Sequence, residues 1–258
     1  MSGALVTGAG TRLGRAMAIY LAERGYDVAV HYAGSEEGAQ DTVEACRAKG
    51  VRAEAVQADL LNPDEVEALV PAASRAVGQL TVLVNNASIF EDDDIETATF
   101  ESWDKHIGSN LRAPFFLTQA FAAQAPEAGT DENGEPIATG LVVNMIDQRV
   151  KKLTPYFMTY TIAKMGLWSF TQTAARALAP RIRVNGIGPG PTLQGANQSD
   201  EAFAHQRRNT VLERGANPAD ITGALGYFLD APAVSGQMLA VDGGQHLGWK
   251  TPEIQGRD

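Results

Sequence analysis

Tyr160 and Lys164, four positions apart, are the residues of this chain best suited to proton-transfer chemistry. Residues at i and i+4 lie on one face of a helix, so the lysine ammonium would lie close to the phenol. A nearby positive charge stabilises a phenolate and lowers a pKa that is ordinarily about 10. The spacing therefore predicts that Tyr160 is a usable acid at neutral pH, although an ordinary surface pair has the same spacing.

A glycine-rich turn near the amino end could hold a phosphate. It runs Thr7-Gly8-Ala9-Gly10-Thr11-Arg12-Leu13-Gly14, between an apolar run and a helical pattern. Glycines let the backbone approach a pyrophosphate, and the N-terminus of the helix offers free N–H groups. The spacing has one residue more than the G-x-G-x-x-G fingerprint, and such turns can simply join two elements. Its place in the chain favours a nucleotide site.

The end of the second apolar run indicates which nucleotide is bound. NAD sites usually carry an Asp or Glu about 20 residues after the glycine turn, where it holds the ribose hydroxyls. This chain has His31-Tyr32-Ala33-Gly34-Ser35 at that point and no carboxylate. The guanidinium of Arg12 could pair with a 2′-phosphate. These observations favour NADP(H) as the cofactor.

The elements that must position these residues alternate between strand-like and helical patterns. Seven β-rich runs lie at residues 4–7, 27–32, 51–57, 80–85, 141–145, 183–187 and 237–241, with helical patterns at 12–24, 36–49, 63–77, 100–124, 159–179 and 218–229. Apolar strands that alternate with helices predict an α/β fold, a doubly wound parallel sheet of the Rossmann type. We expect a single domain over residues 1–258, with ligands beyond the carboxyl ends of the strands.

Two segments are predicted to be loops with separate roles. Residues 126–139 are polar, acidic and turn-rich, which is typical of a surface excursion. The segment 188–199 opens with Gly and Pro and leads into a short polar helix at 200–208. Because it follows the carboxyl end of a strand, we expect residues 192–209 to form a lid over the substrate.

Composition and charge restrict the partners and the location of the protein. The net charge is −10, which disfavours nucleic acid and anionic membranes as partners. No apolar run approaches the roughly 18 residues that span a bilayer, so we expect a cytoplasmic protein. Cys46 is the only cysteine, and the four histidines are scattered without ligand spacing, so no metal site is predicted.

Taken together, these motifs resemble the short-chain dehydrogenase/reductase family over almost the whole chain. The resemblance implies that Tyr160 and Lys164 are catalytic, that Lys164 also binds the nicotinamide ribose, and that Asn110 holds a water of the proton relay. It implies cofactor contacts at the glycine turn and at further positions that match the family's motifs: Gly8, Arg12, Leu13, Gly14, His31, Tyr32, Ser35, Asp59, Leu60, Asn86, Ala87, Ser88, Pro189 and Gly190. The family also implies a homotetramer.

Three departures from the general family pattern resemble the pteridine reductases. Asp147 stands where the family's catalytic Ser is expected, thirteen positions before Tyr160, and Ser88 is followed by Ile89-Phe90. The third is the His-Tyr-x-x-Ser end of the second strand. This likeness implies substrate contacts by Ser88, Phe90, Asp147 and Tyr160, with the pterin ring stacked on Phe90. Gly34 replaces an Arg that pteridine reductases often use for the 2′-phosphate.

The resemblance leaves the substrate open. The preferred interpretation is a pterin-type reductase in which Asp147 manages a proton at the ring. A generic carbonyl reductase for a keto-acyl, sugar or quinone substrate is the alternative within the family. An inactive NADP-binding sensor is a further alternative, but Asn110, Tyr160 and Lys164 are all retained. The sequence does not identify the physiological substrate, its oxidation state or the direction of the reaction.

Overall fold

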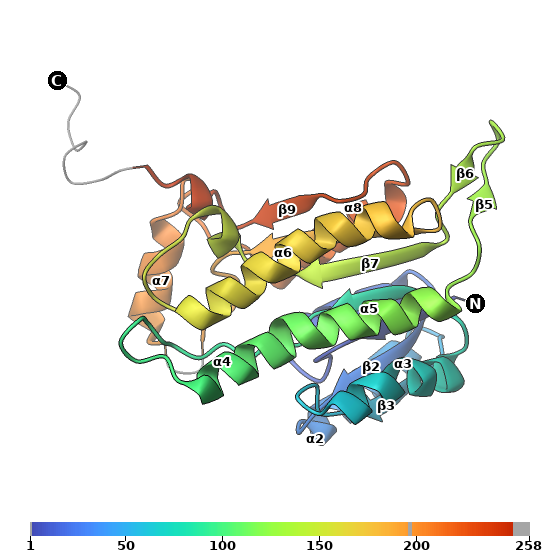
Figure 1. Ribbon diagram of the computed structural model, residues 1–258, viewed down its shortest axis with the longest axis horizontal. Coiled ribbons are helices and arrows are strands. Elements are labelled where there is room, and N and C mark those ends of the chain that lie inside the picture. Colours follow the sequence, from blue (N-terminus) through green and yellow to red (C-terminus); the bar gives the residue numbers. More distant parts are fainter. Residues whose placement is uncertain (1, 196–197, 250–258) are drawn as a thin grey trace.

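Seven parallel strands form one sheet in the computed structural model, which describes residues 2–195 and 198–249 (Figure 1). Their order is β3-β2-β1-β4-β7-β8-β9, so the direction of winding reverses between β1 and β4. The strands are β1 Gly3–Val6, β2 Asp27–Tyr32, β3 Ala53–Gln57, β4 Leu80–Asn85, β7 Gly140–Met145, β8 Ile182–Pro189 and β9 Met238–Val241. The predicted doubly wound sheet is confirmed.

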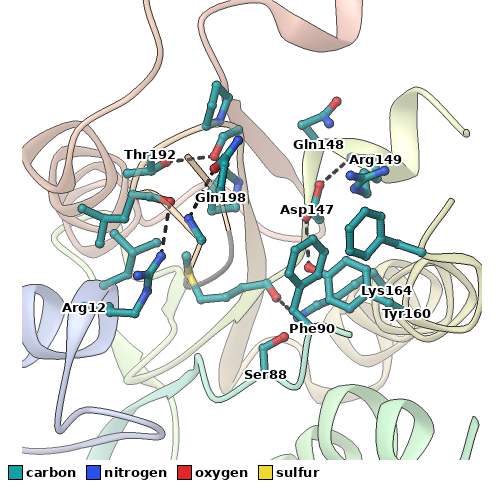
Figure 2. Close-up of a pocket in the computed structure, with 18 of the residues that line it drawn as sticks. Arg12, Ser88, Phe90, Asp147, Gln148, Arg149, Tyr160, Lys164, Thr192 and Gln198 are labelled. Carbon is teal, nitrogen blue, oxygen red and sulfur yellow. Dashed lines mark hydrogen bonds between the residues drawn. The ribbon is translucent and has the colours of Figure 1, made fainter. Parts of the chain in front are cut away.

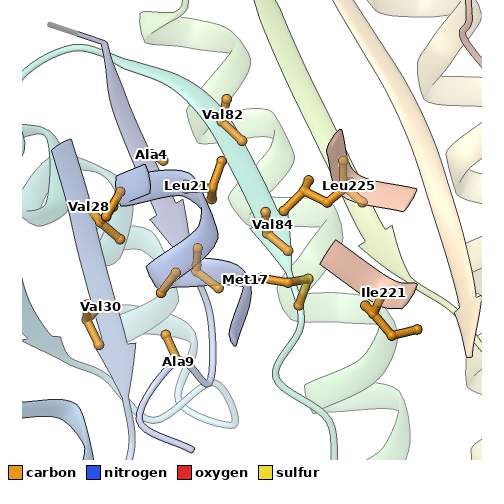
Figure 3. Packing of buried hydrophobic residues seen from close by; sticks show 14 of the residues in the cluster. Ala4, Ala9, Met17, Leu21, Val28, Val30, Val82, Val84, Ile221 and Leu225 are labelled. Atoms are coloured by element: carbon orange, nitrogen blue, oxygen red, sulfur yellow. The ribbon is translucent and has the colours of Figure 1, made fainter. Parts of the chain in front are cut away.

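Helices cover both faces of the sheet, and each face has its own apolar cluster. One face packs against α1 (Arg12–Glu23), α2 (Glu36–Arg47) and α8 (Pro218–Asp230), with Met17 and Leu21 of α1 against Val28 and Val84 (Figure 3). The other face packs against α3 (Pro63–Val77), α5 (Ala113–Gln124) and α6 (Met158–Leu178).

Alternation along each strand explains why the strands read as unbroken apolar runs. Ala4 and Val6 of β1 belong to the first cluster, while Leu5 between them belongs to the second. Successive side chains of a strand point to opposite faces, so a sheet covered on both sides needs apolar residues at every position. This double burial fixes the strands, and their carboxyl ends become a rigid edge on which loops can carry chemistry.

The helix predicted over residues 100–124 is interrupted, which corrects the sequence-based expectation. Helix α4 (Phe100–Ile107) passes through a π-helical turn, Gly108–Arg112, before α5 begins. The Ala113 N–H donates to the carbonyl of Gly108, five residues earlier, and Pro114 has no N–H to continue the α-helical ladder. The wide turn carries Asn110, and such turns occur frequently at functional sites.

Residues 126–139 form a small β-hairpin instead of an irregular loop. Strands β5 (Gly129–Thr130) and β6 (Pro136–Ile137) pair antiparallel, and the carboxylate of Asp131 accepts backbone N–H bonds within the turn. The hairpin lies at the end of the molecule opposite to α7 (Asp200–Arg208) (Figure 1). No helix among the described residues is both long and apolar enough to cross a membrane.

Candidate active site

A cleft of about 1430 Å³ opens at the carboxyl edge of the sheet, as the strand pattern predicts (Figure 2). Small-molecule pockets commonly enclose about 300–1,000 Å³, so this cleft has room for a dinucleotide and a second ligand. Its walls come from the glycine turn, the segments after β4, β7 and β8, and the first turns of α6 and α7.

The glycine turn fits a dinucleotide because its backbone is left uncovered. Gly8 has a φ of +62°, which favours glycine. A Cβ on Gly14 would lie 2.1 Å from the carbonyl oxygen of Gly8, so any larger residue would displace the turn. Helix α1 begins directly after Thr11, so its free N–H groups face the cleft where Leu13 and Gly14 line it. The turn is therefore a cradle for phosphate groups.

The turn after β4 is fastened to the glycine turn. The hydroxyl of Thr7 accepts hydrogen bonds from the backbone N–H groups of Asn86 and Ala87, at 2.8 and 2.9 Å. The Asn86 amide donates back to the Thr7 carbonyl at 2.8 Å. Asn86 therefore holds two loops of the cleft together, while Ser88 is exposed at the cleft wall.

His31 lies behind the glycine turn rather than in the cleft. The Gly8 N–H donates to its Nδ1 at 2.9 Å, so the proton must be on Nε2, which lies 3.0 Å from the Ala58 carbonyl. Burial lowers the pKa of His31 to about 4. The side chain is 1% exposed, so the implied direct contact between His31 and the cofactor is corrected: His31 supports the turn that would bind the cofactor.

Arg12 points toward the predicted lid. Its guanidinium donates to the carbonyls of Gln194 and Leu193, at 2.9 and 3.2 Å (Figure 2). The end of β2, where the 2′-phosphate is expected, therefore receives no Arg12 contact in this structure. Ser35 is exposed there, and Tyr32 is partly buried against the core. The 2′-phosphate role of Arg12 remains a prediction.

Asp59 and Leu60, in the segment after β3, lie in different environments although both are implied to contact the cofactor. Asp59 is exposed, and its carboxylate accepts the Leu61 N–H at 2.9 Å. Leu60 is buried in the cluster under α3. Leu60 therefore anchors the segment, and Asp59 has surface available for an adenine.

Asp147, Tyr160 and Lys164 meet in the cleft, as predicted. The Tyr160 hydroxyl donates to Oδ2 of Asp147 at 2.9 Å, and the Arg149 N–H donates to Oδ1 at 2.8 Å (Figure 2). Lys164 donates to the Met145 carbonyl at 2.8 Å, with its Nζ 5.5 Å from the centroid of the Tyr160 ring. Tyr160 and Lys164 are almost fully buried.

The expected lowering of the Tyr160 pKa is corrected. Burial, followed by the adjacent Asp147 carboxylate, raises the pKa of Tyr160 well above its ordinary value. Burial also raises the pKa of Asp147 and lowers the pKa of Lys164 to about 8. Desolvation and a carboxylate in direct contact outweigh the positive charge of Arg149, which lowers the pKa. Tyr160 therefore keeps its proton at neutral pH and shares it with Asp147 through a hydrogen bond.

Asn110 fixes the backbone that carries Phe90. Its amide donates to the Ile89 carbonyl at 2.9 Å and accepts from the Ile89 N–H at 3.1 Å. Asn110 therefore positions Ile89 in this structure, and the role implied for it in holding a relay water stays a prediction.

Phe90 lies in the cleft wall and belongs to an aromatic group. It is 52% exposed and stacks on Phe157, with ring centroids 4.3 Å apart and an interplanar angle of 2°. The Phe90 and Tyr160 rings form an edge-to-face pair, with ring centroids 4.8 Å apart. Two residues of this group were not predicted from the sequence, namely Phe157 and Arg149, whose guanidinium lies 4.5 Å from the centroid of the Phe157 ring. Arg149 lies close to Asp147 in the sequence, and Phe157 lies close to Tyr160. This proximity is the signal that could have indicated that both residues belong to the site.

A buried polar network, also missed from sequence, supports this wall. His106 accepts the Glu91 N–H at Nε2, 3.1 Å away, and its Nδ1 lies 2.6 Å from the Thr159 hydroxyl. Asp93 binds the Thr159 N–H at 3.0 Å and also its hydroxyl. The network ties the segment after Phe90 to the start of α6, one residue before Tyr160.

The segment after β8 closes the far side of the cleft. Pro189 ends β8 and lines the cleft, and a Cβ on Gly190 would lie 2.5 Å from the Cβ of Asp242. Of the predicted lid, 192–209, residues 196–197 lie outside the described part of the chain. Its helix is α7, as predicted at residues 200–208. No group of three His, Cys, Asp or Glu side chains suited to a metal occurs among the residues that the structure describes.

Comparison with known proteins agrees with this geometry. A family model described as "Enoyl-(Acyl carrier protein) reductase" matches residues 8–246. The structure is similar to that of FolM alternative dihydrofolate reductase 1 from Brucella suis in complex with NADP, at 41% identity, with 98% of each chain covered and a TM-score of 0.91. The sequence is 35% identical to 3-oxoacyl-(acyl-carrier-protein) reductase FabG of Staphylococcus aureus, over 95% of this chain and 98% of the relative.

A third similar protein is a ketoreductase. The angucycline C-6 ketoreductase LanV with bound NADP is 30% identical, with 96% of each chain covered and a TM-score of 0.86. The chain belongs to the short-chain dehydrogenase/reductase family, which confirms the resemblance seen in its sequence. It is an NAD(P)-dependent oxidoreductase of that family.

Proposed function

We propose that this enzyme uses NADPH to reduce a pterin or a related flat heterocycle. The observation that carries the proposal is the Asp147 carboxyl, hydrogen-bonded to Tyr160 at 2.9 Å beside the exposed face of the aromatic wall formed by Phe90. A carboxyl group can accept ring N–H donors and can return a proton to a ring nitrogen, neither of which a serine hydroxyl does as readily. The similarity to an alternative dihydrofolate reductase supports this substrate class.

The cofactor is NADP(H), which similar solved structures contain. The cradle of Gly8 and Gly14 would hold its pyrophosphate, and Lys164 would bind the nicotinamide ribose. The bound cofactor would supply the hydride. Arg12 and Ser35 are the residues proposed for its 2′-phosphate, and Asp59 for the adenine.

Tyr160 and Asp147 would deliver the proton that must accompany the hydride. Both groups have raised pKa values, so a proton is held between them at neutral pH. The ammonium of Lys164, in turn, stabilises negative charge left on the pair. Asn110 keeps Ile89 and therefore Phe90 in place, so that a flat ring can stack on the wall while its polar edge faces Asp147.

A carbonyl reductase is the second candidate. The similarity to a 3-oxoacyl reductase and to a ketoreductase favours it, since the catalytic Tyr and Lys are compatible with both substrate classes. An inactive sensor remains the least supported alternative, because the catalytic pair and Asn110 are all in place. A homotetramer and a cytoplasmic location are further proposals that rest on the family pattern.

The substrate class is tested by following NADPH absorbance with purified enzyme. We expect oxidation of NADPH with dihydropterins and dihydrofolate, and little with a panel of keto-acyl, sugar and quinone substrates. Turnover of the carbonyl panel without any reduction of the ring substrates would contradict the proposal and favour the carbonyl reductase.

A further inference from the structure

Arg149 is a cation in the cleft wall that the proposed chemistry does not use. Its backbone N–H binds Asp147, while its side chain extends along the aromatic group and lines the cleft. The guanidinium lies 4.5 Å over the Phe157 ring and 6.0 Å from the centroid of Phe90 (Figure 2). It is therefore held beside the place where a flat ring would stack.

The guanidinium keeps donors available for a ligand. In the part of the chain that the structure describes, it donates one hydrogen bond to a side chain, from Nη1 to the Thr154 hydroxyl at 3.0 Å. Within residues 2–195 and 198–249, no carboxylate forms an ion pair with it. A guanidinium presents five N–H donors in a plane, so most of them remain for a planar anion such as a carboxylate.

Strain in the adjacent backbone indicates that this arrangement is maintained for a reason. Phe157, on which Arg149 rests, has a φ of +56°, an unusual conformation for a bulky residue. Such strain costs of order 1–3 kcal/mol and clusters at ligand sites. In this conformation the Phe157 ring contacts both the Phe90 ring, at 4.3 Å between centroids, and the Arg149 guanidinium, at 4.5 Å, so aromatic surface and cation form one continuous wall.

The charge of the whole protein favours a local cation beside an anionic substrate. The net charge is −10, and Glu91 and Asp92 also line the cleft. A carboxylate-bearing substrate would be repelled by this surface unless a cation faces it. The Nζ of Lys105 lies 3.8 Å from the Glu91 carboxylate and pairs with it. Lys105 therefore does not provide the positive charge that would attract a substrate carboxylate.

We propose that Arg149 is a specificity-determining residue that binds a carboxylate on the side chain of the ring substrate. The inference rests on the proposed function and narrows its substrate class to flat heterocycles with an acidic tail. The ring would stack on Phe90, and the tail would pass along Phe157 to the guanidinium. Arg149→Gln removes the charge but keeps hydrogen-bonding capacity, and Arg149→Lys restores the charge.

The test compares two substrates that share a ring, dihydrofolate with carboxylates on its tail and dihydrobiopterin with a neutral side chain. We expect Arg149→Gln to raise the KM for dihydrofolate about tenfold, as loss of a charged hydrogen bond implies, and to leave kcat within about twofold. The KM for dihydrobiopterin should not change. Arg149→Lys should recover part of the loss, and the matched control Arg176→Gln, on the exposed side of α6, should have no effect.

Equal effects on both substrates, or none, would overturn the inference. Equal effects accompanied by a shifted pH profile would mean that Arg149 acts through Asp147 and Tyr160.

A binding measurement distinguishes failure of this inference from failure of the proposed function. Calorimetric titration of folate and biopterin into the enzyme–NADP⁺ complex requires no turnover. Folate should bind more tightly than biopterin in the wild type and lose that advantage in Arg149→Gln, and equal affinities in the wild type would refute the acidic tail. Absence of turnover with either dihydro substrate would refute the proposed function instead.

Discussion

The contact between Asp147 and Tyr160 sets the proton chemistry of this site. Burial raises the pKa of Tyr160, and the Asp147 carboxylate raises it further, because a negative charge in direct contact opposes ionisation of the phenol. A serine at position 147 would remove the second contribution and leave the effect of burial. On the proposed function, the pair would act as a proton store rather than as a phenolate, which would suit protonation of a ring nitrogen.

Lys164 makes the activity dependent on pH in the alkaline range. Burial lowers its pKa to about 8, so its charge is present below that pH and is lost as pH rises through it. We expect kcat/KM to fall as pH rises through about 8, because an uncharged amine no longer stabilises the reacting pair. A pH profile with the ring substrate measures this.

The same profile in Asp147→Asn serves as the control for that prediction. Its activity should be low, yet the alkaline decrease should persist if Lys164 is the titrating group. Loss of the alkaline decrease in this variant would assign it to Asp147, and a flat wild-type profile up to pH 10 would contradict the prediction altogether.

At the scale of elements, loops are held by buried polar side chains rather than by apolar packing. His31 joins the glycine turn to the segment after β3, and Asn110 joins the π-helical turn to Ile89. Each of these side chains satisfies a donor and an acceptor of the backbone. Loss of one leaves two buried groups unpaired, which is more costly than loss of the hydrogen bonds themselves.

His31→Leu should therefore destabilise the protein and weaken cofactor binding. We expect the free energy of unfolding to decrease by about 2–4 kcal/mol, from the unpaired Gly8 N–H and Ala58 carbonyl. The Kd for NADPH should rise because the glycine turn loses its support. Chemical denaturation and a binding titration measure the two effects, with His31→Gln as the control that retains one donor and one acceptor.

The pH dependence of stability provides a second readout for His31. Its pKa is about 4 when folded, against about 6.5 in the unfolded chain, so the unfolded state takes up a proton first as pH falls. Stability contributed by His31 is complete above pH 6.5 and is lost as pH falls toward 4. The His31→Gln variant should lack this component, and an unchanged acid profile in it would contradict the assignment.

The sequence patterns predicted where the strands and the candidate site residues lie better than they predicted the contacts between these residues. The apolar runs at β1 and β4 were evident because both faces of the sheet are buried. The pairing of Asp147 with Tyr160 was implied by family resemblance, but the upward shift in the Tyr160 pKa depends on burial, which no local pattern encodes. The contacts of Phe90 with Arg149 and Phe157 join segments that are far apart in sequence, and the π-helical turn lies within an otherwise helical pattern, next to Pro114.

At the scale of the whole molecule, the phosphate cradle and the aromatic wall occupy different parts of one edge of the sheet. The carboxyl ends of β1 to β3 carry the phosphate cradle and its supports, while those of β4, β7 and β8 carry the aromatic wall, Asp147 and the lid segment. Both sets line one cleft, and side chains of α7 line it as well. On the proposed function, substitutions around the aromatic wall would change the substrate class without altering the phosphate cradle.

The central claim is that Asp147 adapts the family's site to ring reduction, and Asp147→Ser tests it most directly. NADPH oxidation should be measured for wild type and Asp147→Ser with a dihydropterin and with a ketone, together with the Kd for NADPH. The account predicts that ring reduction falls by about 100-fold or more, as expected for loss of a proton donor, while NADPH still binds and ketone reduction is retained or improved. Ring reduction that is unaffected by Asp147→Ser would contradict it.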